Sequence, residues 1–291
     1  MLIARLIADP DHLSVNCASA LAALDAEGIV ASAAPFGEDG LQFTVESDNR
    51  AAVRAVIDMH FQPCDLLIAD HEPTIPQVFV SDMDSTMIEA ECIDELADFA
   101  GIKHQIAAIT ERAMQGELDF ESALRERVML LRDLSAGAIT ECLDTRIAPM
   151  AGAKVLVETL KAKGCRTVLV TGGFHHFADP VAEQLGFERV VANRLEVIDG
   201  SLTGGLVGGI TDSGVKKAVL IEEAAQIGAG AVSLATGDGA NDIPMLEQAT
   251  YGIAYRAKPK ARDAADGWVD RGDLTVVLQL LGVPRAEWVG V

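Results

Sequence analysis

Aromatic residues, paired cysteines and long apolar runs are all scarce in this chain of 291 residues. Phe, Tyr and Trp together make up 4% of the residues, so we expect a largely aliphatic core. The five cysteines are odd in number and contain no C-x-x-C pair, which favours reduced thiols over a disulfide framework. No apolar segment approaches the ~18 residues of a membrane span, and the first apolar run is too short for a signal peptide. These absences predict a cytoplasmic protein.

Positive charge is scarce as well. The chain has 23 Lys and Arg against 44 Asp and Glu, which gives a formal net charge of −21. This excess argues against nucleic acid or an anionic membrane as a partner. It would also repel an anionic substrate, so binding one would require a metal ion and a few placed cations to reverse the local field.

The clearest chemical pattern is a pair of aspartates directly after a short apolar run. Residues 78–80 are Val-Phe-Val, which is typical of a buried strand, and Asp82, Asp84, Ser85 and Thr86 follow. In an open α/β sheet, ligands bind at the carboxyl ends of the strands. Two carboxylates there suit Mg²⁺, and they also suit a division of labour between a nucleophile and a general acid and base. The alternative is that they cap the helix that follows.

Residues 1–75 are predicted to form a domain of their own. Strands are expected at 2–8, 29–36, 41–46 and 64–69, and helices at 11–27 and 49–60. This order, βαββαβ, is the ferredoxin-like pattern, and it resembles the ACT-type regulatory domains of amino-acid enzymes. Such a domain would sense a ligand or serve as a dimerisation or solubility module. Pro73 and Pro76 mark a stiff linker to the second domain, residues 76–291.

The second domain is predicted to be an α/β domain with a helical insertion. Helices expected at 91–100, 103–115, 119–131 and 136–144 form a cap at about 90–146, a lid that would exclude water and supply specificity. Beyond the cap, strands are expected at 166–170, within 189–206, and at 232–235 and 251–254. Helices are expected at 152–163, 180–185, 212–227, 258–265 and 274–281. This alternation predicts a parallel, doubly wound sheet.

Three further patterns lie in this second half. The tripeptide Thr-Gly-Gly at 171–173 follows a predicted strand, where a hydroxyl and backbone N–H groups can hold a phosphate. Lys216 and Lys217 lie on a predicted helix, where lysines are by default solvated. Residues 237–242, Gly-Asp-Gly-Ala-Asn-Asp, follow another strand and combine acids with glycines that permit close backbone approach.

Taken in order, these four segments resemble the four motifs of the haloacid dehalogenase superfamily of phosphatases and, more closely, its phosphoserine phosphatase family. The resemblance covers about residues 77–255. It implies that Asp82 attacks phosphorus to form an aspartyl phosphate, and that Asp84 acts as general acid and base. The motif lysine would be Lys216 or Lys217, with the spacing favouring Lys216, and Asp242 would position it.

The resemblance also implies Mg²⁺ bound by Asp82, the Asp84 carbonyl and Asp238. Glu91 would pair with the ammonium of O-phosphoserine, and Arg127 with its carboxylate. The other substrate-binding residues that it implies are Ser85, Met114, Phe120, Thr171, Gly172 and Asn241. The implied reaction is the hydrolysis of this small molecule to serine and phosphate, the last step of serine biosynthesis, with a homodimer as one possible assembly.

Two other functions stay open at this point. One is hydrolysis or transfer of a different small phosphate, which the loss of Glu91 and Arg127 would favour, yet both are present. The other is an amino-acid sensor built on residues 1–75 with an inactive phosphatase body. A sensor of that kind would be expected to have lost its nucleophilic aspartate, whereas Asp82 and Asp84 are both present.

Overall fold

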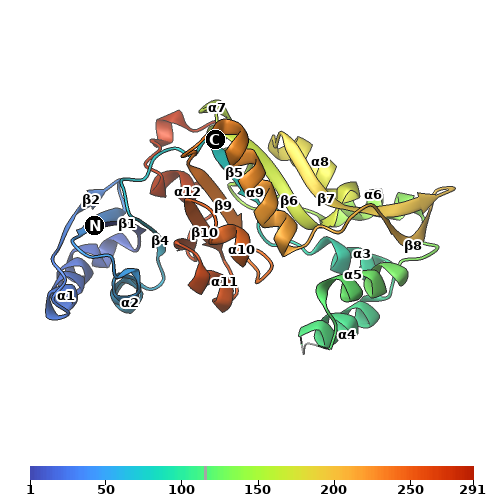
Figure 1. Cartoon of the computed structure of the whole chain (residues 1–291), viewed down its shortest axis with the longest axis horizontal. Helices are drawn as coiled ribbons and strands as arrows, with labels where there is room; N and C mark the ends of the chain where they lie inside the picture. Colours follow the sequence, from blue (N-terminus) through green and yellow to red (C-terminus); the bar gives the residue numbers. More distant parts are fainter. Residues whose placement is uncertain (115–116) are drawn as a thin grey trace.

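A single sheet runs through the protein from one end to the other. The computed structural model describes residues 1–114 and 117–291, apart from the side chain of Met114. Its eleven strands lie in the order β2-β3-β1-β4-β11-β10-β9-β5-β6-β7-β8 (Figure 1). Within these described residues, no helix combines the length and the apolar character needed to cross a bilayer.

The first four strands form the ferredoxin-like arrangement that the sequence predicts. They are β1 (Leu2–Ile7), β2 (Ala31–Phe36), β3 (Gly40–Val45) and β4 (Asp65–Ala69), paired antiparallel in the order β2-β3-β1-β4. The two helices are α1 (Leu13–Ala26) and α2 (Arg50–Phe61). Alternate residues of β1, Leu2, Ala4 and Leu6, are buried in one core cluster with Leu24 of α1 and Ile57 of α2. Side-chain alternation therefore determines which face of this sheet the helices cover.

The predicted parallel sheet is confirmed for the central strands. These are β5 (Val78–Ser81), β6 (Arg166–Phe174), β7 (Arg189–Ile198), β9 (Ser233–Gly237), β10 (Tyr251–Tyr255) and β11 (Gly267–Val269). The sheet as a whole is mixed, because β8 (Ser201–Val207) pairs antiparallel with β7 at one edge and the four N-terminal strands are antiparallel as well. The accompanying helices are α7 (Ala153–Ala162), α8 (His175–Leu185), α9 (Ser213–Ile227), α10 (Ile243–Leu246), α11 (Pro259–Ala264) and α12 (Thr275–Leu280). The sequence analysis predicted a helix that begins at residue 180. That start is wrong, since Pro180 lies inside α8, which begins at His175.

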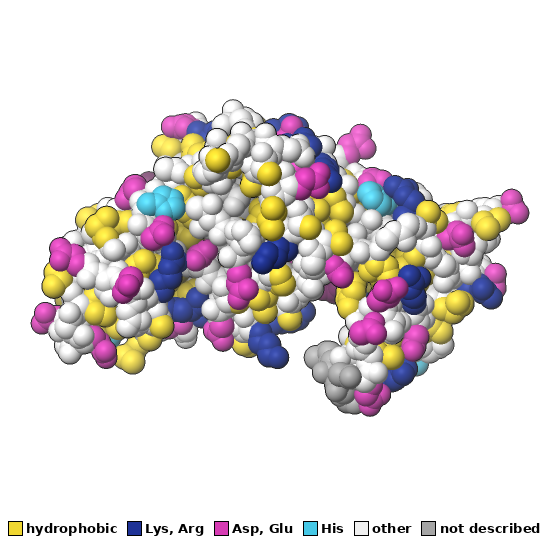
Figure 2. Space-filling view, in the orientation of Figure 1, with side chains coloured by type: hydrophobic (Ala, Val, Ile, Leu, Met, Phe, Trp, Pro, Cys, Tyr) yellow, Lys and Arg dark blue, Asp and Glu magenta, His cyan; other side chains and the backbone are white. Residues whose placement is uncertain are grey.

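The predicted helical cap lies between β5 and β6 in the chain. It consists of α3 (Cys92–Phe99), α4 (Lys103–Met114), α5 (Phe120–Met129) and α6 (Ala136–Arg146). Helices α4 and α5 project away from the sheet (Figure 1), and Figure 2 shows a notch between them and the body of the protein. The β7–β8 hairpin supports the cap, because Asp133 N–H donates to Leu202 O and Ala136 N–H donates to Gly200 O, both over 2.9 Å.

The two predicted domains are joined by strand pairing. Strand β4 runs antiparallel to β11, with Leu66 opposite Trp268. The Trp268 indole N–H donates to Cys64 O over 3.0 Å, and the Asp65 carboxylate accepts hydrogen bonds from the backbone N–H groups of residues 270–272. The sequence pattern does not predict β11, because a strand of three residues is too short to show alternation. The sheet is therefore continuous across the proline linker.

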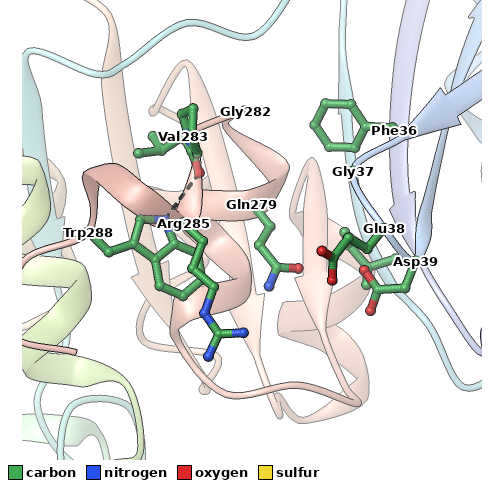
Figure 3. Close-up of a pocket in the computed structure, with 11 residues that line it drawn as sticks. Phe36, Gly37, Glu38, Asp39, Gln279, Gly282, Val283, Arg285 and Trp288 are labelled. Carbon is green, nitrogen blue, oxygen red and sulfur yellow. Dashed lines mark hydrogen bonds between the residues drawn. The ribbon is translucent and has the colours of Figure 1, made fainter.

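A cavity of about 400 Å³ lies where the N-terminal domain meets the end of the chain (Figure 3). Phe36 and Glu38, at the turn between β2 and β3, lie across it from Gln279, Arg285 and Trp288. None of the catalytic residues predicted from the sequence lines this cavity. The predicted catalytic residues are therefore expected at the carboxyl ends of the parallel strands.

Candidate active site

The candidate site lies at the carboxyl end of β5, where the strand order changes direction. Strand β5 pairs in parallel with β9 on one side and with β6 on the other. The chain continues straight into Asp82, whose N–H donates to Thr236 O at the end of β9 over 3.0 Å. The Ser81 and Thr236 hydroxyls lie 2.7 Å apart beneath it. This is the switch point at which open α/β sheets bind their ligands.

Lys216 is buried between two carboxylates. Its Nζ lies 2.6 Å from Asp82 Oδ1 and 2.7 Å from Asp242 Oδ1. Burial alone would lower the pKa of Lys216, but Asp82 and Asp242 outweigh that effect and raise the pKa above its ordinary value. Lys217, the alternative that the sequence left open, is only partly buried and faces neither carboxylate within ion-pair distance among the described residues. The structure therefore brings Lys216 to the aspartates.

Asp82 is held in surroundings that disfavour its charge. Burial raises the pKa of Asp82 well above its usual range, the neighbouring Asp242 raises it further, and Lys216 opposes both. Its Oδ1 is fully buried, and in the described part of the chain it has the Lys216 ammonium as an ion-pair partner but no well-aligned hydrogen-bond donor. An under-satisfied carboxylate oxygen of this kind suits a nucleophile or a metal ligand.

The loop after β9 is organised by Asp242. The Asp242 Oδ2 accepts hydrogen bonds from Asp238 N–H (3.2 Å) and Gly239 N–H (3.0 Å). A Cβ atom at Gly237 would come within 2.4 Å of Asp242 Cγ, so only glycine lets this carboxylate sit under the loop. Asp242 thus anchors Lys216 through one oxygen and the loop that carries Asp238 through the other.

The carboxylates of Asp82, Asp238 and Asp242 lie within 4.8 Å of one another. An all-oxygen donor set fits Mg²⁺, a hard cation. Both Asp242 oxygens are already engaged, by Lys216 and by the loop N–H groups. Asp82 and Asp238, which contact the ammonium groups of Lys216 and Lys258, are therefore the carboxylates placed to hold a metal, with the Asp84 carbonyl as the third ligand that the sequence predicts.

Asp84 is placed between the cap and the sheet. Its Oδ1 accepts from Cys92 N–H at the start of α3 over 3.0 Å, and its Oδ2 accepts from the Thr171 hydroxyl at 3.4 Å. Burial raises the pKa of Asp84, while the Cys92 hydrogen bond opposes the rise. A Cβ at Gly173 would lie 2.9 Å from Asp84 Oδ2, which explains glycine at that position. A carboxyl with a raised pKa can carry a proton nearer neutral pH than an ordinary aspartate.

The Thr-Gly-Gly segment is held in place by a residue that the sequence analysis missed. Asn193 of β7 is buried, donates through Nδ2 to Gly172 O (2.7 Å), and accepts at Oδ1 from Thr211 N–H (2.8 Å). The Thr171 hydroxyl in turn accepts from Gly173 N–H over 2.9 Å. The sequence feature that could have identified Asn193 is its position, as a single amide side chain directly after the apolar residues 190–192 of a strand. Asn193 fixes the backbone that carries Thr171 and Gly172.

Glu91 lies directly before α3 and shares a hydrogen bond with Ser85, whose hydroxyl donates to Glu91 Oε1 over 2.9 Å. Ser85 has a positive φ of 55°, an uncommon conformation for a residue other than glycine. Although the Glu91 side chain is accessible to solvent, partial desolvation by the surrounding protein, together with Asp84, raises its pKa to about 7, and the Ser85 bond opposes this. Glu91 is therefore a carboxylate that titrates near neutral pH.

Arg127, on α5, is half-buried without a carboxylate partner. Its Nε donates to Ala123 O over 3.3 Å, and no carboxylate among the described residues lies within 4 Å of its guanidinium. Burial lowers the pKa of Arg127, while Asp94 and Glu91 oppose the change. A half-buried guanidinium without an ion pair is suited to an anionic group of a ligand.

The remaining predicted residues come from the cap and from the loop after β9. The Phe120 ring lies against the end of β6, since a Cβ at Gly172 would be 3.3 Å from Phe120 Cζ. Asn241 is exposed, and a Cβ at Gly239 would be 2.4 Å from its Oδ1. The Met114 side chain lies outside the described residues. The structure thus places Asp82 and Lys216 in direct contact in the interior, whereas Asp84, two residues further along the chain, is partly exposed.

Comparisons with known proteins agree with this geometry. Residues 79–247 match the family model described as haloacid dehalogenase-like hydrolase. The chain is 43% identical over 206 residues to a phosphoserine phosphatase of Polaromonas sp., covering 69% of this chain and 87% of that protein. It is 40% identical over 236 residues to a phosphoserine phosphatase of Archaeoglobus fulgidus, covering 81% of this chain and 67% of that protein.

Solved structures extend the likeness to the N-terminal region. The fold superposes on a HAD family hydrolase from Salmonella enterica serovar Typhi with a TM-score of 0.83 at 27% identity, covering 97% of this chain and 99% of that one. It superposes on a probable phosphoserine phosphatase from Vibrio cholerae with a TM-score of 0.76 at 30% identity, covering 98% and 88%. The N-terminal ferredoxin-like part therefore has counterparts in proteins of the same overall build.

Proposed function

Because this chain belongs to the haloacid dehalogenase-like hydrolase family and is a relative of its phosphoserine phosphatases, we propose that it hydrolyses O-phosphoserine to serine and phosphate. The reaction would pass through an aspartyl phosphate on Asp82, with Mg²⁺ as cofactor. The observation that carries the proposal is the buried contact of Asp82 with Lys216 at the carboxyl end of β5. A carboxylate and an ammonium at a switch point fit nucleophilic attack on an anionic phosphate.

The nucleophile and the proton carrier come from the same stretch of chain. Asp82 attacks phosphorus, which splits hydrolysis into formation and breakdown of an acyl phosphate. Asp84, with its raised pKa, donates a proton to the leaving serine oxygen and then takes one from the attacking water. Lys216 neutralises charge on the transferring group, and Asp242 holds that lysine in place.

The metal-binding residues in this proposal are Asp82, Asp238 and the carbonyl of Asp84. Mg²⁺ bound there would shield the phosphate charge from the incoming carboxylate. Within the described residues, the carboxylates of Asp82, Asp238 and Asp242 lie together with one buried lysine that contacts two of them, so the cluster carries an excess of negative charge. A divalent cation is the natural counter-charge for such a site.

Specificity for an amino-acid phosphate is assigned to the cap. Glu91 would bind the substrate ammonium, and Arg127 its carboxylate, through charge-assisted hydrogen bonds. Phe120, resting on Gly172, would close the apolar side, with Met114 as a further predicted contact. Ser85, Thr171, Gly172 and Asn241 would complete the phosphate and substrate cradle. The free guanidinium of Arg127 favours this substrate over a phosphate ester that lacks a carboxylate.

Several wider assignments belong to the same proposal. The enzyme would act in the cytoplasm in the last step of serine biosynthesis. Residues 1–75 would form an ACT-like domain and residues 76–291 the phosphatase domain, with the cap at about 90–146 inserted in the second. A homodimer through the N-terminal domain is compatible with the exposed edge of β2.

Phosphate release over a panel of phosphomonoesters tests the proposal. We expect phosphoserine to be the best substrate, with activity that needs Mg²⁺ and is lost after dialysis against a chelator. Ca²⁺ should inhibit, because its larger coordination number lets Asp82 bind the metal through both oxygens and lose its attacking geometry. A preference for a plain aryl phosphate, or full activity in excess chelator, would contradict the substrate or the metal assignment respectively.

A further inference from the structure

Lys258 places a second positive charge beside Asp238, and none of the roles above uses it. Its Nζ lies 3.4 Å from Asp238 Oδ2, with the lysine side chain 70% exposed and the aspartate side chain 11% exposed. Lys258 directly precedes α11, whose first residue is Pro259, and its backbone N–H donates to Asp238 O over 2.9 Å. The backbone of residue 258 is therefore fixed to the metal-binding loop, while its side chain remains movable.

The two lysines of the site differ in how they are held. Lys216 is enclosed by Asp82 and Asp242 at 2.6 and 2.7 Å and is almost completely buried, so it cannot leave without exposing two carboxylates. Lys258 makes one longer ion pair with most of its side chain in water. An ion pair whose lysine lies mostly in water contributes little to stability and is easily broken. Lys258 is thus the cation of the site that can move.

The Asp238 carboxylate needs a positive charge beside it, which a metal ion supplies when bound and another group must supply when it is not. Its carboxylate lies within 4.8 Å of those of Asp82 and Asp242, and Lys216 pairs with these two rather than with Asp238. In the structure, Lys258 supplies the positive charge. A divalent cation on the same carboxylate would lie within a few ångströms of the ammonium and repel it.

We propose that Lys258 is a positioning residue that acts as the counter-ion of Asp238 when no metal is bound and gives way to the divalent cation. Its side chain therefore weakens Mg²⁺ binding. This inference rests on the proposed function for the identity of the metal ligands. It concerns metal affinity, however, and not the substrate or the chemical step.

Calorimetric titration of the metal-free, full-length protein with MgCl₂, without substrate, tests the proposal. Lys258→Met keeps the backbone bond to Asp238 O and removes the ammonium, so we expect Mg²⁺ to bind about fivefold more tightly, the upper range for an exposed ion pair. Lys258→Arg retains the charge and should bind Mg²⁺ like the unmodified protein. Lys260→Met, an exposed lysine on the same helix, is the matched control and should also be unchanged. Unchanged or weaker binding by Lys258→Met would overturn the proposal.

Displacement of the side chain can be followed separately. In protein labelled with ¹³C at lysine Cε, the Lys258 signal, assigned from its loss in Lys258→Met, should shift on addition of Mg²⁺, while the Lys260 signal stays in place. A Lys258 signal that ignores Mg²⁺ would show that the pair persists and would overturn the exchange. Neither measurement depends on phosphoserine turnover, so the inference can fail while the phosphatase assignment stands, and the reverse also holds.

Discussion

Lys216 Nζ lies 2.6 Å from Asp82 Oδ1, and the two side chains are 1% and 5% exposed. Because Asp242 lies on the other side of the same ammonium, one buried cation serves two buried carboxylates. Asp82, the proposed nucleophile, is therefore held in a fixed direction by a charge contact and a backbone hydrogen bond to Thr236 O. Fixed orientation of this kind is a large part of what an active site contributes to rate.

Replacing the nucleophile should separate activity from stability. Asp82→Asn should reduce phosphate release below detection, because an amide cannot form the acyl phosphate. Since the folded state raises the pKa of Asp82, its ionised form costs stability at pH 8, above the ordinary pKa. The melting temperature of Asp82→Asn at pH 8 should thus equal or exceed that of the unmodified enzyme. Substantial turnover by this variant would refute the mechanism.

Asp84→Asn tests the general acid and base. We expect turnover to fall by at least ~10²-fold, the usual contribution of such a group. The amide can still accept from Cys92 N–H, so the fold and the cap position should be retained. Steady-state kinetics and circular dichroism on the same preparation provide the check. A loss of less than tenfold would assign the proton transfer to another group.

Removing the buried lysine should damage both the fold and the reaction. Lys216→Met leaves Asp82 and Asp242 without their shared partner, and breaking a buried ion pair on one side costs about 3–5 kcal/mol. Lys217→Met, at the adjacent and only partly buried position, should stay within about 0.5 kcal/mol. Urea unfolding measures both variants. Equal effects would mean that the contact to Asp82 is not what stabilises this helix.

The pH dependence of substrate binding should report on Glu91. The pKa of Glu91 is about 7 in the free protein, so its negative charge is present above that pH and is lost as the pH falls through it. The ratio of kcat/KM for phosphoserine to that for an aryl phosphate should therefore rise with pH through about 7. Taking the ratio cancels the ionisation of Asp84, which both substrates share, and comparison with Glu91→Gln removes the ionisation of the two phosphates. In Glu91→Gln the ratio should be lower and independent of pH; a persisting rise would exclude Glu91 as its origin.

The role of Arg127 can be tested against a neighbour on the same helix. Arg127→Ala should raise KM for phosphoserine by about 10- to 100-fold, the range for losing a hydrogen bond to a charged group, with a much smaller effect on an aryl phosphate. Arg125→Ala is the matched control, because Arg125 is exposed and paired with Glu121. Equal losses on both substrates would place Arg127 in the fold or at the phosphate.

The active-site motifs could be predicted because each follows a strand, and strand ends of a parallel sheet converge. The sequence placed Asp82, Thr171 and Asp238 on three strand ends, and the structure has these strands, β5, β6 and β9, side by side. Spacing favoured Lys216 over Lys217, but only the structure shows which of the two side chains leaves α9 toward Asp82 and Asp242. Asn193 was missed because its role is to bind backbone atoms of two distant segments, which no local pattern records.

The extent of each domain was harder to predict than its type. Alternation and helix periodicity identified the ferredoxin-like part and the cap, since both are dominated by local signals. The pairing of β4 with β11 joins residues that lie some 200 positions apart and depends on a strand of three residues. The elevated pKa of Glu91 is likewise a property of packing, because it arises from desolvation and from Asp84.

The strand pairing between β4 and β11 has a consequence for how the protein melts. Two modules on a flexible tether would each absorb heat at a temperature of its own. Here the buried Trp268 and Asp65 bridge the two parts, and one apolar core cluster contains residues of both. Loss of either part would leave the edge of a sheet and a large apolar surface open to water, so neither is expected to persist alone. Differential scanning calorimetry should therefore show one endotherm whose calorimetric and van't Hoff enthalpies agree, as for a single cooperative unit.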